Sequence, residues 1–272
     1  MTVDVEDYYH VSAFEKHIKR EKWDSYPSRI EENITKILDI FGNHDIKATF
    51  FILGWVAEKY PESIKKIAQF GHEIASHGYS HIRVTNQEPL QFREDISKTK
   101  DILENVSGVT VNGYRAASYS INSHDHWAYK ILEECGYKYS SSVYPIKHDL
   151  YGIPDAPRYP YKPNNSNIFE IPVSTVQLNS YRIPCGGGGY FRLFPYFISR
   201  RLIKMVNLKE GKPCIFYFHP WELDTEQPRQ KGVSIKTRFR HYININRTEN
   251  RLNRLLDDFN WDRMDKIYRK YM

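Results

Sequence analysis

The chain has 272 residues, of which 40% are hydrophobic, 15% aromatic and 26% charged, a composition that excludes an intrinsically disordered protein. It contains no apolar run of roughly 18 residues, so no membrane-spanning helix is expected, and no secretory signal peptide precedes the first predicted strand. The formal net charge of +6 would suit an anionic partner. We instead expect a basic, solvated helix near the C-terminus, no nucleic-acid partner, and a cytoplasmic or membrane-peripheral location.

Strands and helices are predicted to alternate through the first 145 residues. Strands are expected at short apolar runs rich in β-branched and aromatic residues, at positions 2–5, 48–53, 72–76, 109–114 and 137–143. Helices are expected where apolar residues recur every three or four positions, at positions 30–42, 61–71, 89–108 and 124–134. Repeated strand–helix–strand units imply a parallel α/β sheet, either open and doubly wound or closed into a (β/α) barrel. No glycine-rich phosphate loop follows the first strand, which disfavours dinucleotide binding.

The second half is less regular. Residues 145–167 form a long proline-rich connection, and long connections in compact domains are often functional. Strands are predicted at 168–176 and 214–218, a flexible loop at the four glycines 186–189, and a helix at 248–271. Because no linker interrupts the chain, we expect a single domain spanning residues 1–272, with a C-terminal part (about 145–272) packed on the barrel.

Three carboxylates, Asp4, Glu6 and Asp7, stand where the first predicted strand ends. Like charges this close repel one another unless they lie in water or a cation neutralises them. His77 and His81 follow the third predicted strand, and a spacing of four on one helical turn would let both imidazoles reach one metal ion. Taken alone, either group could be solvated surface. Together, an acidic side chain and two histidines suit Zn²⁺, and also Co²⁺, Ni²⁺, Mn²⁺ or Fe²⁺.

Two further polar residues follow predicted strands. Arg115 could hold a neighbouring carboxylate or an anionic ligand, and a surface salt bridge is an equal alternative. His219 ends an apolar strand, where an imidazole that titrates near neutral pH can donate a proton to a leaving group. The alternative for His219 is a histidine satisfied by the backbone at the edge of the core.

Four stretches, in this order, resemble the motifs of the polysaccharide deacetylases, the NodB-homology group also known as carbohydrate esterase family four. They are Thr2–Asp7, Ser76–His81, Tyr114–Ser118 and Phe218–Trp221. Asp4–His10, and His219–Glu222 together with Gln227–Arg229, also resemble a subgroup found in exopolysaccharide gene clusters linked to exosortase systems. The resemblance covers about residues 1–230. It implies a distorted, TIM-like (β/α)7 barrel that removes N-acetyl groups from an acetylated glycan with one divalent metal ion.

The resemblance also implies a ligand set. His77 and His81 would hold the metal together with Asp7, with zinc as the expected ion and cobalt, nickel or manganese as alternatives. The family commonly has two adjacent aspartates in its first motif, whereas this chain reads Asp-Val-Glu-Asp. Glu6 is therefore the alternative acidic ligand, and otherwise a contact to the substrate.

The remaining roles follow from the same resemblance. Asp4 would be the general base, Arg115 would orient it, and His219 would be the general acid. A backbone N–H near Tyr119 would help to stabilise the oxyanion. Trp221 could stack on a sugar face, because pyranose rings present apolar C–H surfaces to aromatic rings.

Two rival functions would use the same residues. One is a metal-dependent amidase that acts on a small, non-sugar C–N substrate with the same barrel. The other is a non-catalytic glycan-binding module. The complete set of candidate acid, base and ligands argues against the second rival, since a site that has lost its chemistry usually lacks one of them.

Overall fold

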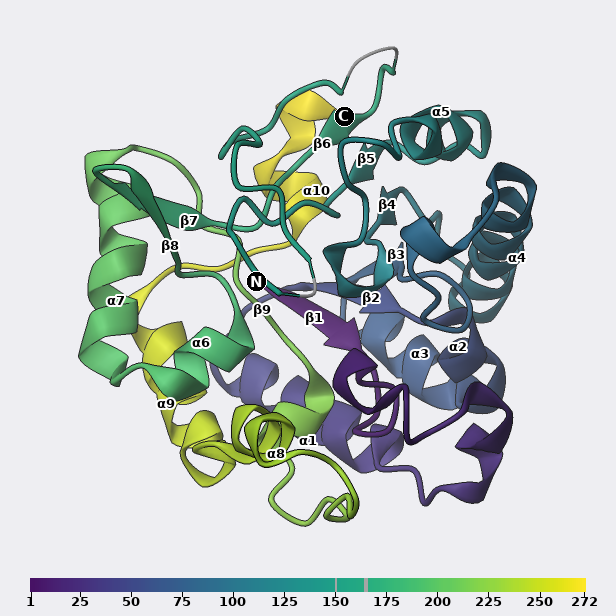
Figure 1. The fold of residues 1–272 in the computed structure, drawn as a ribbon, viewed down its shortest axis with the longest axis horizontal. Helices are drawn as coiled ribbons and strands as arrows, with labels where there is room; N and C mark the ends of the chain where they lie inside the picture. Colours follow the sequence, from purple (N-terminus) through teal and green to yellow (C-terminus); the bar gives the residue numbers. More distant parts are fainter. Residues whose placement is uncertain (150, 164–165) are drawn as a thin grey trace.

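A computed structural model describes residues 1–149, 151–163 and 166–272. It is built on a curled, seven-stranded sheet with strand order β6-β5-β4-β3-β2-β1-β9, in which every neighbouring pair is parallel (Figure 1). The strands are β1 (Thr2–Val5), β2 (Thr49–Ile52), β3 (Glu73–Ser76), β4 (Gly113–Tyr114), β5 (Tyr139–Ser140), β6 (Phe169–Glu170) and β9 (Tyr217–Phe218). A separate antiparallel hairpin joins β7 (Thr175–Leu178) to β8 (Tyr181–Pro184).

Helices surround the outside of this sheet (Figure 1). Along the chain they are α1 (Ile30–Asn43), α2 (Gly54–Lys59), α3 (Pro61–Gln69), α4 (Pro89–Ser107), α5 (Trp127–Glu134), α6 (Gly188–Leu193), α7 (Tyr196–Lys204), α8 (Ile235–Tyr242), α9 (Ile245–Asp258) and α10 (Met264–Ile267). Parallel strands alternating with outer helices give the distorted (β/α) barrel that was expected, and this prediction is confirmed.

Local sequence explains the regular half of the barrel. The central strands β1, β2 and β3 are buried along their whole length, as a parallel sheet covered on both sides requires. Helix α4 starts with Pro89 at its first position, where the missing N–H costs nothing, and Glu88 and Gln91 form a capping box. It ends at Gly108, which adopts a left-handed φ of 71° as the C-terminal cap.

Irregular segments fill the gap between the edge strands β6 and β9. The Cys185 N–H donates to the carbonyl of Ser174 (3.3 Å), and the Tyr217 N–H donates to the carbonyl of Gly186 (2.7 Å). Gly186 stands where an added Cβ would lie 2.2 Å from the Ile215 carbonyl oxygen, so only glycine fits this close approach. The long second half of the chain thus completes the wall that the regular strands leave open.

Four predictions about the elements are wrong in detail. The glycines expected to form a flexible loop instead begin α6, and the helix expected at 248–271 is broken into α9 and α10. The strand expected at 168–176 is split between β6 and β7, which belong to different sheets. The helix expected to end at residue 42 continues to Asn43, and Asp45 takes the left-handed φ (49°) just beyond it. In each case packing against the rest of the barrel overrides the local pattern.

Candidate metal and catalytic site

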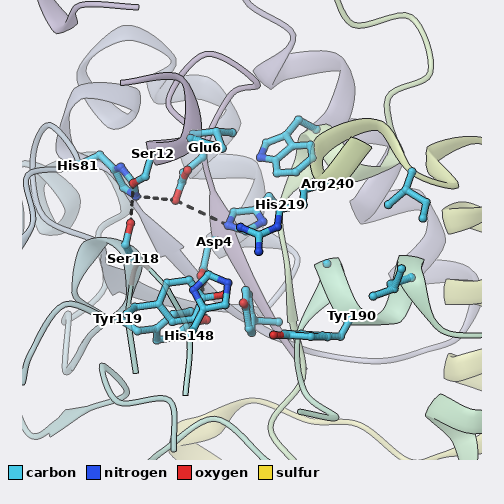
Figure 2. A pocket seen from close by; sticks show the side chains of 18 of the residues that line it. Asp4, Glu6, Ser12, His81, Ser118, Tyr119, His148, Tyr190, His219 and Arg240 are labelled. Atoms are coloured by element: carbon cyan, nitrogen blue, oxygen red, sulfur yellow. Dashed lines mark hydrogen bonds and ion pairs between the residues drawn. The ribbon is translucent and has the colours of Figure 1, made fainter. Parts of the chain in front are cut away.

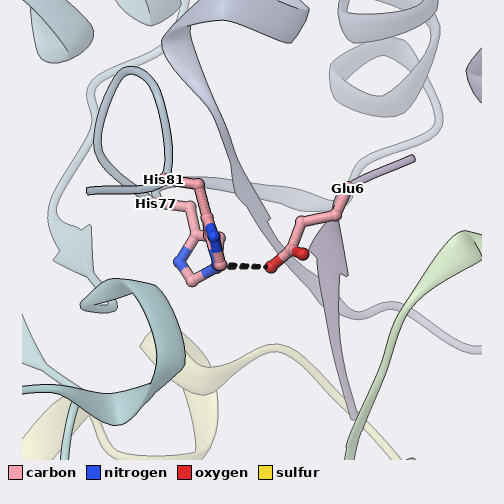
Figure 3. Close-up of side chains that lie close together, drawn as sticks. All are labelled: Glu6, His77 and His81. Atoms are coloured by element: carbon pink, nitrogen blue, oxygen red, sulfur yellow. Dashed lines mark hydrogen bonds and ion pairs between the residues drawn. The ribbon is translucent and has the colours of Figure 1, made fainter. Parts of the chain in front are cut away.

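Three buried side chains meet at the carboxyl ends of β1 and β3: Glu6, His77 and His81. The Nε2 atoms of both histidines lie 3.0 Å from Oε1 of Glu6 (Figure 3). One candidate ligand atom from each residue lies within 4.8 Å of the other two, and all three side chains are buried. This spacing is the one that a single cation shared by the three groups requires.

The chemistry of these donors fits a metal ion. Nδ1 of His77 lies 2.8 Å from the carbonyl oxygen of Arg115, which can only accept, so Nδ1 carries the proton. A neutral His77 therefore directs the lone pair of Nε2 at the carboxylate of Glu6, which is also an acceptor. Burial would raise the pKa of Glu6, but His81 and His219 outweigh it and hold that pKa well below its usual value. Those histidines lower the pKa through positive charge. When the rings are neutral and present lone pairs, a cation between them and the carboxylate would supply that charge instead.

The two histidines are brought together by a loop and not by a helix. The sequence analysis placed His77 and His81 on one helical turn, but residues 77–81 are not helical. The chain turns at Gly78 (φ 74°), and His81 itself has a left-handed φ of 54°. Such a backbone conformation costs a non-glycine residue of order 1 kcal/mol or more and is found mainly at functional sites.

Asp7, the expected acidic ligand, lies elsewhere, so this prediction is corrected in favour of Glu6. One carboxylate oxygen of Asp7 accepts from the N–H of Tyr8 (2.9 Å), and the other accepts from the Ser28 hydroxyl and the Arg29 N–H (both 2.8 Å). Burial raises the pKa of Asp7 to about 6, although these donors act in the opposite direction. Asp7 thus ties the segment after β1 to the start of α1.

Asp4 is held by a buried arginine. Oδ1 of Asp4 accepts from Nη1 of Arg115 at 2.5 Å, and both side chains are almost completely inaccessible to solvent. The guanidinium also donates to Thr2 Oγ1 (2.9 Å), to the Ser141 carbonyl (3.1 Å) and to Ser141 Oγ (3.0 Å). With its other donors occupied, Arg115 fixes the position of one carboxylate oxygen, in the place where the sequence analysis expected it.

Tyr119 contacts the same carboxylate through its side chain. Its hydroxyl donates to Oδ2 of Asp4 (3.3 Å), and both Ser118 (φ 54°) and Tyr119 (φ 50°) have left-handed backbone conformations. The N–H of Tyr119 donates to the carbonyl of Ala116 (3.0 Å). The N–H of Tyr119 itself is thus engaged in the turn, an oxyanion donor near Tyr119 stays a prediction, and the hydroxyl is the group that Tyr119 presents to Asp4.

His219 belongs to a charged relay that the sequence analysis missed. Its Nδ1 lies 2.8 Å from Oε1 of Glu222, and Oε2 of Glu222 accepts from Nε of Arg192 (2.6 Å). Burial would lower the pKa of His219, but Glu6 and Glu222 raise it to about 9. Nε2 faces Glu6 at 3.8 Å. The close spacing of His219 and Glu222 was the available signal, since a short helical turn after β9 returns the carboxylate to the imidazole.

These groups line one pocket, which we call the central pocket, with a volume of about 340 Å³ (Figure 2). Asp4, Glu6 and His219 lie at its polar end, where the figure shows Glu6 joined by dashed lines to His81 and His219. The remaining walls are largely aromatic and aliphatic: Tyr119, Tyr151, Tyr190, Leu193, Tyr217, Trp221, Phe239 and Ile243. Most of these apolar walls come from the second half of the chain.

Trp221 contributes less open surface than expected. It is 4% exposed, and its ring stacks on His241 with centroids 4.1 Å apart and an interplanar angle of 13°. It also stacks on His219, with centroids 5.3 Å apart. Trp221 therefore supports the imidazole of His219 from behind and offers only part of its ring to the pocket.

No helix among the described residues combines the length and apolar character that crossing a bilayer demands.

Two family models divide the chain between them. Residues 22–140 match the polysaccharide deacetylase model, and residues 141–269 match a domain of unknown function, DUF3473. Among characterised proteins, a peptidoglycan-N-acetylglucosamine deacetylase from Bacillus cereus is 45% identical over 73 residues. That match covers 27% of this chain and 26% of the Bacillus protein, so the likeness concerns about a quarter of that protein's length.

Solved structures share the fold along most of the chain. One is the crystal structure of a Mycobacterium smegmatis protein assigned to the polysaccharide deacetylases, with a TM-score of 0.63 and 20% identity. The match covers all of this chain and 88% of that one. An allantoinase aligns with a TM-score of 0.57 and 20% identity, over 88% of this chain and 72% of its own. At this level of identity both matches describe the architecture alone.

Proposed function

Because this chain belongs to the polysaccharide deacetylase family, we propose that it hydrolyses N-acetyl groups on an amino-sugar polymer with the help of one divalent metal ion. One observation carries the proposal. A base held by an arginine, a histidine supported by a glutamate, and a trio of metal-ligating side chains all line a single pocket. These are the parts that amide hydrolysis needs.

Glu6, His77 and His81 would hold the ion, with zinc as the expected metal and cobalt, nickel or manganese as alternatives. A divalent ion bound there would act as a Lewis acid and would lower the pKa of coordinated water. His77 is oriented for this role by the carbonyl of Arg115, and Glu6 brings the negative charge that stabilises a bound cation.

Asp4 acts as the general base in this proposal. Arg115 and the Tyr119 hydroxyl bind its two oxygens, so the carboxylate has one orientation when it accepts the proton of the attacking water. Tyr119 also lies at the wall of the central pocket, where its ring would contact a bound acyl group. Fixed geometry of this kind lowers the entropic cost of reaching the transition state.

His219 acts as the general acid and protonates the departing sugar amine. Glu222 accepts from Nδ1, so the proton to be donated lies on Nε2, which faces the central pocket. Arg192 in turn keeps Glu222 ionised, because burial would raise the pKa of that carboxyl and the guanidinium lowers it to about 2. Glu222 and Arg192 are positioning residues that keep His219 charged and correctly turned.

The test is acetate release from N-acetylated glycans by the metal-free protein and by the protein loaded with one metal at a time. We expect acetate to appear with zinc or a neighbouring divalent ion and to disappear with a chelator. An Asp4→Asn variant, which keeps the hydrogen-bonding shape, serves as the chemically inactive control. Metal-independent acetate release, or equal rates with Asp4→Asn, would refute the proposal.

The finer biological setting is also part of the proposal. We infer a role in exopolysaccharide synthesis, at a cytoplasmic or membrane-peripheral site, from the resemblance of the first and last motifs to proteins of such gene clusters. Residues 1–272 would act as one catalytic domain, with the part after about residue 145 forming pocket walls. Limited proteolysis with and without metal tests the single unit, which should resist cleavage near residue 141.

A small-molecule amidase is the second candidate, because the walls of the central pocket are largely apolar and its volume of about 340 Å³ would also hold a small amide. Release of ammonia or amine from small cyclic amides would support it. A glycan-binding module without catalysis is the third. It would bind chito-oligosaccharides with and without metal and release no acetate.

A further inference from the structure

We propose that the substrate polymer is acidic, and that a basic groove continuous with the central pocket holds its negatively charged sugars. This inference rests on the proposed function and specifies its substrate class. The groove is a cavity of about 690 Å³ beside the central pocket, between the segment that follows β1 and helix α8. The two cavities share part of their lining, namely Val11, Ser12, Ala13, Trp221 and Arg240. The two cavities are therefore neighbours, and we infer that a polymer with one sugar at the metal-ligand trio extends past these shared residues into the groove.

Cationic side chains outnumber carboxylates in the lining of the basic groove. Five lysines and arginines face two acidic residues there: Lys16, Lys19, Arg83, Lys236 and Arg240 against Glu15 and Asp149. Like charges crowded in a concave surface raise the free energy of the unliganded protein. An anionic ligand removes this cost, and a neutral ligand does not.

The carboxylates on the α8 side of the groove do not cancel its charge. Asp149 is shared by two cations, Lys236 at 3.2 Å and Arg240 at 3.0 Å. Asp149 and Arg240 are about half exposed, and Lys236 is 69% exposed. Exposed ion pairs of this kind contribute little to stability, because water screens them and both side chains lose freedom when they pair. Their cations can therefore turn to a ligand at small cost.

The opposite side of the groove has the same imbalance. Glu15 is shared by Arg20 at 3.0 Å and Arg83 at 3.5 Å. Nε of Arg83 is buried and has no hydrogen-bond partner among the described residues. Lys16 and Lys19 are exposed and form no ion pair within the described part of the chain. The groove thus presents unsatisfied positive charge along its length.

The charge pattern along the path favours an acidic glycan over a nucleic acid. The inner end, at the central pocket, carries the carboxylates Asp4 and Glu6 beside apolar walls, and the outer end is basic. A phosphodiester chain has a negative charge on every nucleotide and would bring one of them against the apolar walls of the central pocket. A glycan that alternates acetylated amino sugars with uronic acids can place a neutral sugar there and carboxylates in the groove.

Hyaluronan oligosaccharides, which alternate glucuronate and N-acetylglucosamine, are the probe, and the same oligosaccharides with their carboxylates reduced to alcohols are the matched neutral control. We expect the metal-loaded protein to bind the acidic form about tenfold or more tightly, with the preference lost when salt is raised from about 20 to 300 mM. Isothermal titration calorimetry measures this without requiring turnover, and acetate release is followed in parallel.

A triple variant, Lys16→Glu, Lys19→Glu and Lys236→Glu, should abolish the preference for the acidic form. The control, Lys66→Glu, Lys130→Glu and Lys209→Glu, makes the same change in net charge on α3, on α5 and beyond α7 and should keep that preference. Equal binding of both oligosaccharides by the natural protein, or equal behaviour of the two triple variants, would overturn the inference. So would tighter binding of a short DNA duplex through the same lysines.

The experiment distinguishes a failure of the proposed function from a failure of the groove assignment. If the chain is no deacetylase, neither oligosaccharide releases acetate in any metal, while the difference in binding between the two remains measurable. If only the groove is misassigned, acetate is released equally from both.

Discussion

The two ends of the parallel sheet each bury a glutamate, and the neighbours of the two carboxylates are of opposite kinds. At the carboxyl ends, Glu6 faces the imidazole nitrogens of His77 and His81. At the amino ends, the first residue of β3, Glu73, accepts hydrogen bonds from the Thr49 hydroxyl (2.5 Å), the Tyr139 hydroxyl (2.8 Å) and the Asp265 N–H (3.1 Å).

This difference separates a functional carboxylate from a structural one. Glu73 has donors for both of its oxygens and needs no further ligand, and burial raises its pKa to about 7. Glu6 is surrounded by groups that act as acceptors when neutral, and it is complete only with a cation. Burial of a carboxylate does not by itself identify a functional site. What identifies it is whether the groups around the carboxylate are hydrogen-bond donors or acceptors.

The largest expected effect is at the metal-ligand trio. Glu6→Gln should remove bound metal and lower kcat/KM for acetate release by about a thousandfold or more, because a neutral amide cannot replace the charge of the carboxylate. Asp7→Asn should keep the metal, since Asp7 binds the start of α1. Metal content by elemental analysis and acetate release measure both. If Glu6→Gln keeps its bound metal and Asp7→Asn loses it, Asp7 is the acidic ligand after all.

An intermediate effect is expected at the relay behind His219. Glu222→Gln should lower kcat by about ten- to a hundredfold with KM nearly unchanged, because the acid loses its orientation while the pocket walls remain. Glu73→Gln is the matched control, the same substitution at the other end of the sheet, and should leave kcat within about twofold. A change in KM alone for Glu222→Gln would mean that Glu222 shapes the pocket and does not position the acid.

A smaller effect is expected at Tyr119. Tyr119→Phe keeps the ring and removes one long hydrogen bond to Asp4, so kcat should fall by about three- to tenfold. Arg115→Lys should cost more, because a lysine cannot reproduce the several hydrogen bonds of the buried guanidinium. Steady-state kinetics at saturating metal distinguish the two variants, and an equal loss in both would contradict this ordering.

The smallest effect on activity, and a distinct one on stability, is expected at Glu73. Its pKa is raised from 4.5 in the unfolded chain to about 7 in the folded protein, so the folded state binds the proton more tightly. The resulting stabilisation is complete below about pH 4.5 and is lost as the pH rises through about 7. Between pH 5 and 8, the natural protein should therefore lose about 1 to 3 kcal/mol more unfolding free energy than Glu73→Gln.

Urea unfolding of both proteins at a series of pH values measures this difference. If the unfolding free energy changes with pH by the same amount in the two proteins, Glu73 stays ionised in the folded state. A loss of metal binding in Glu73→Gln would contradict the separation of the two ends of the sheet.

Much of the regular half could be predicted from local sequence. The strand at residues 2–5 and the helix opening at Pro89 and ending at Gly108 lie where periodicity and capping residues placed them. A burial pattern and a cap are properties of neighbouring residues, so the sequence carries them directly. The short helix α2 was missed because its six residues continue the apolar pattern of the preceding strand.

Most candidate site residues were also predictable, because parallel strands bring their carboxyl ends to one edge of the sheet. Asp4 lies in the second half of β1, and His77, His81, Arg115 and His219 follow strands. All five lie around the central pocket or directly support its lining. The choice between Glu6 and Asp7 was not predictable. It depends on Ser28 and Arg29, some twenty residues away, which bind Asp7 and leave Glu6 to the histidines.

The amino-acid sequence by itself determined the alternation of strands and helices in the first 145 residues and the kinds of side chain near their strand ends, because both are local properties. Only the tertiary structure decided which carboxylate joins the histidines, that Glu222 and Arg192 support His219, and which walls enclose the pocket. Each of these depends on contacts between segments distant in the chain, where direction and distance are set by packing and by the pairing of buried charges.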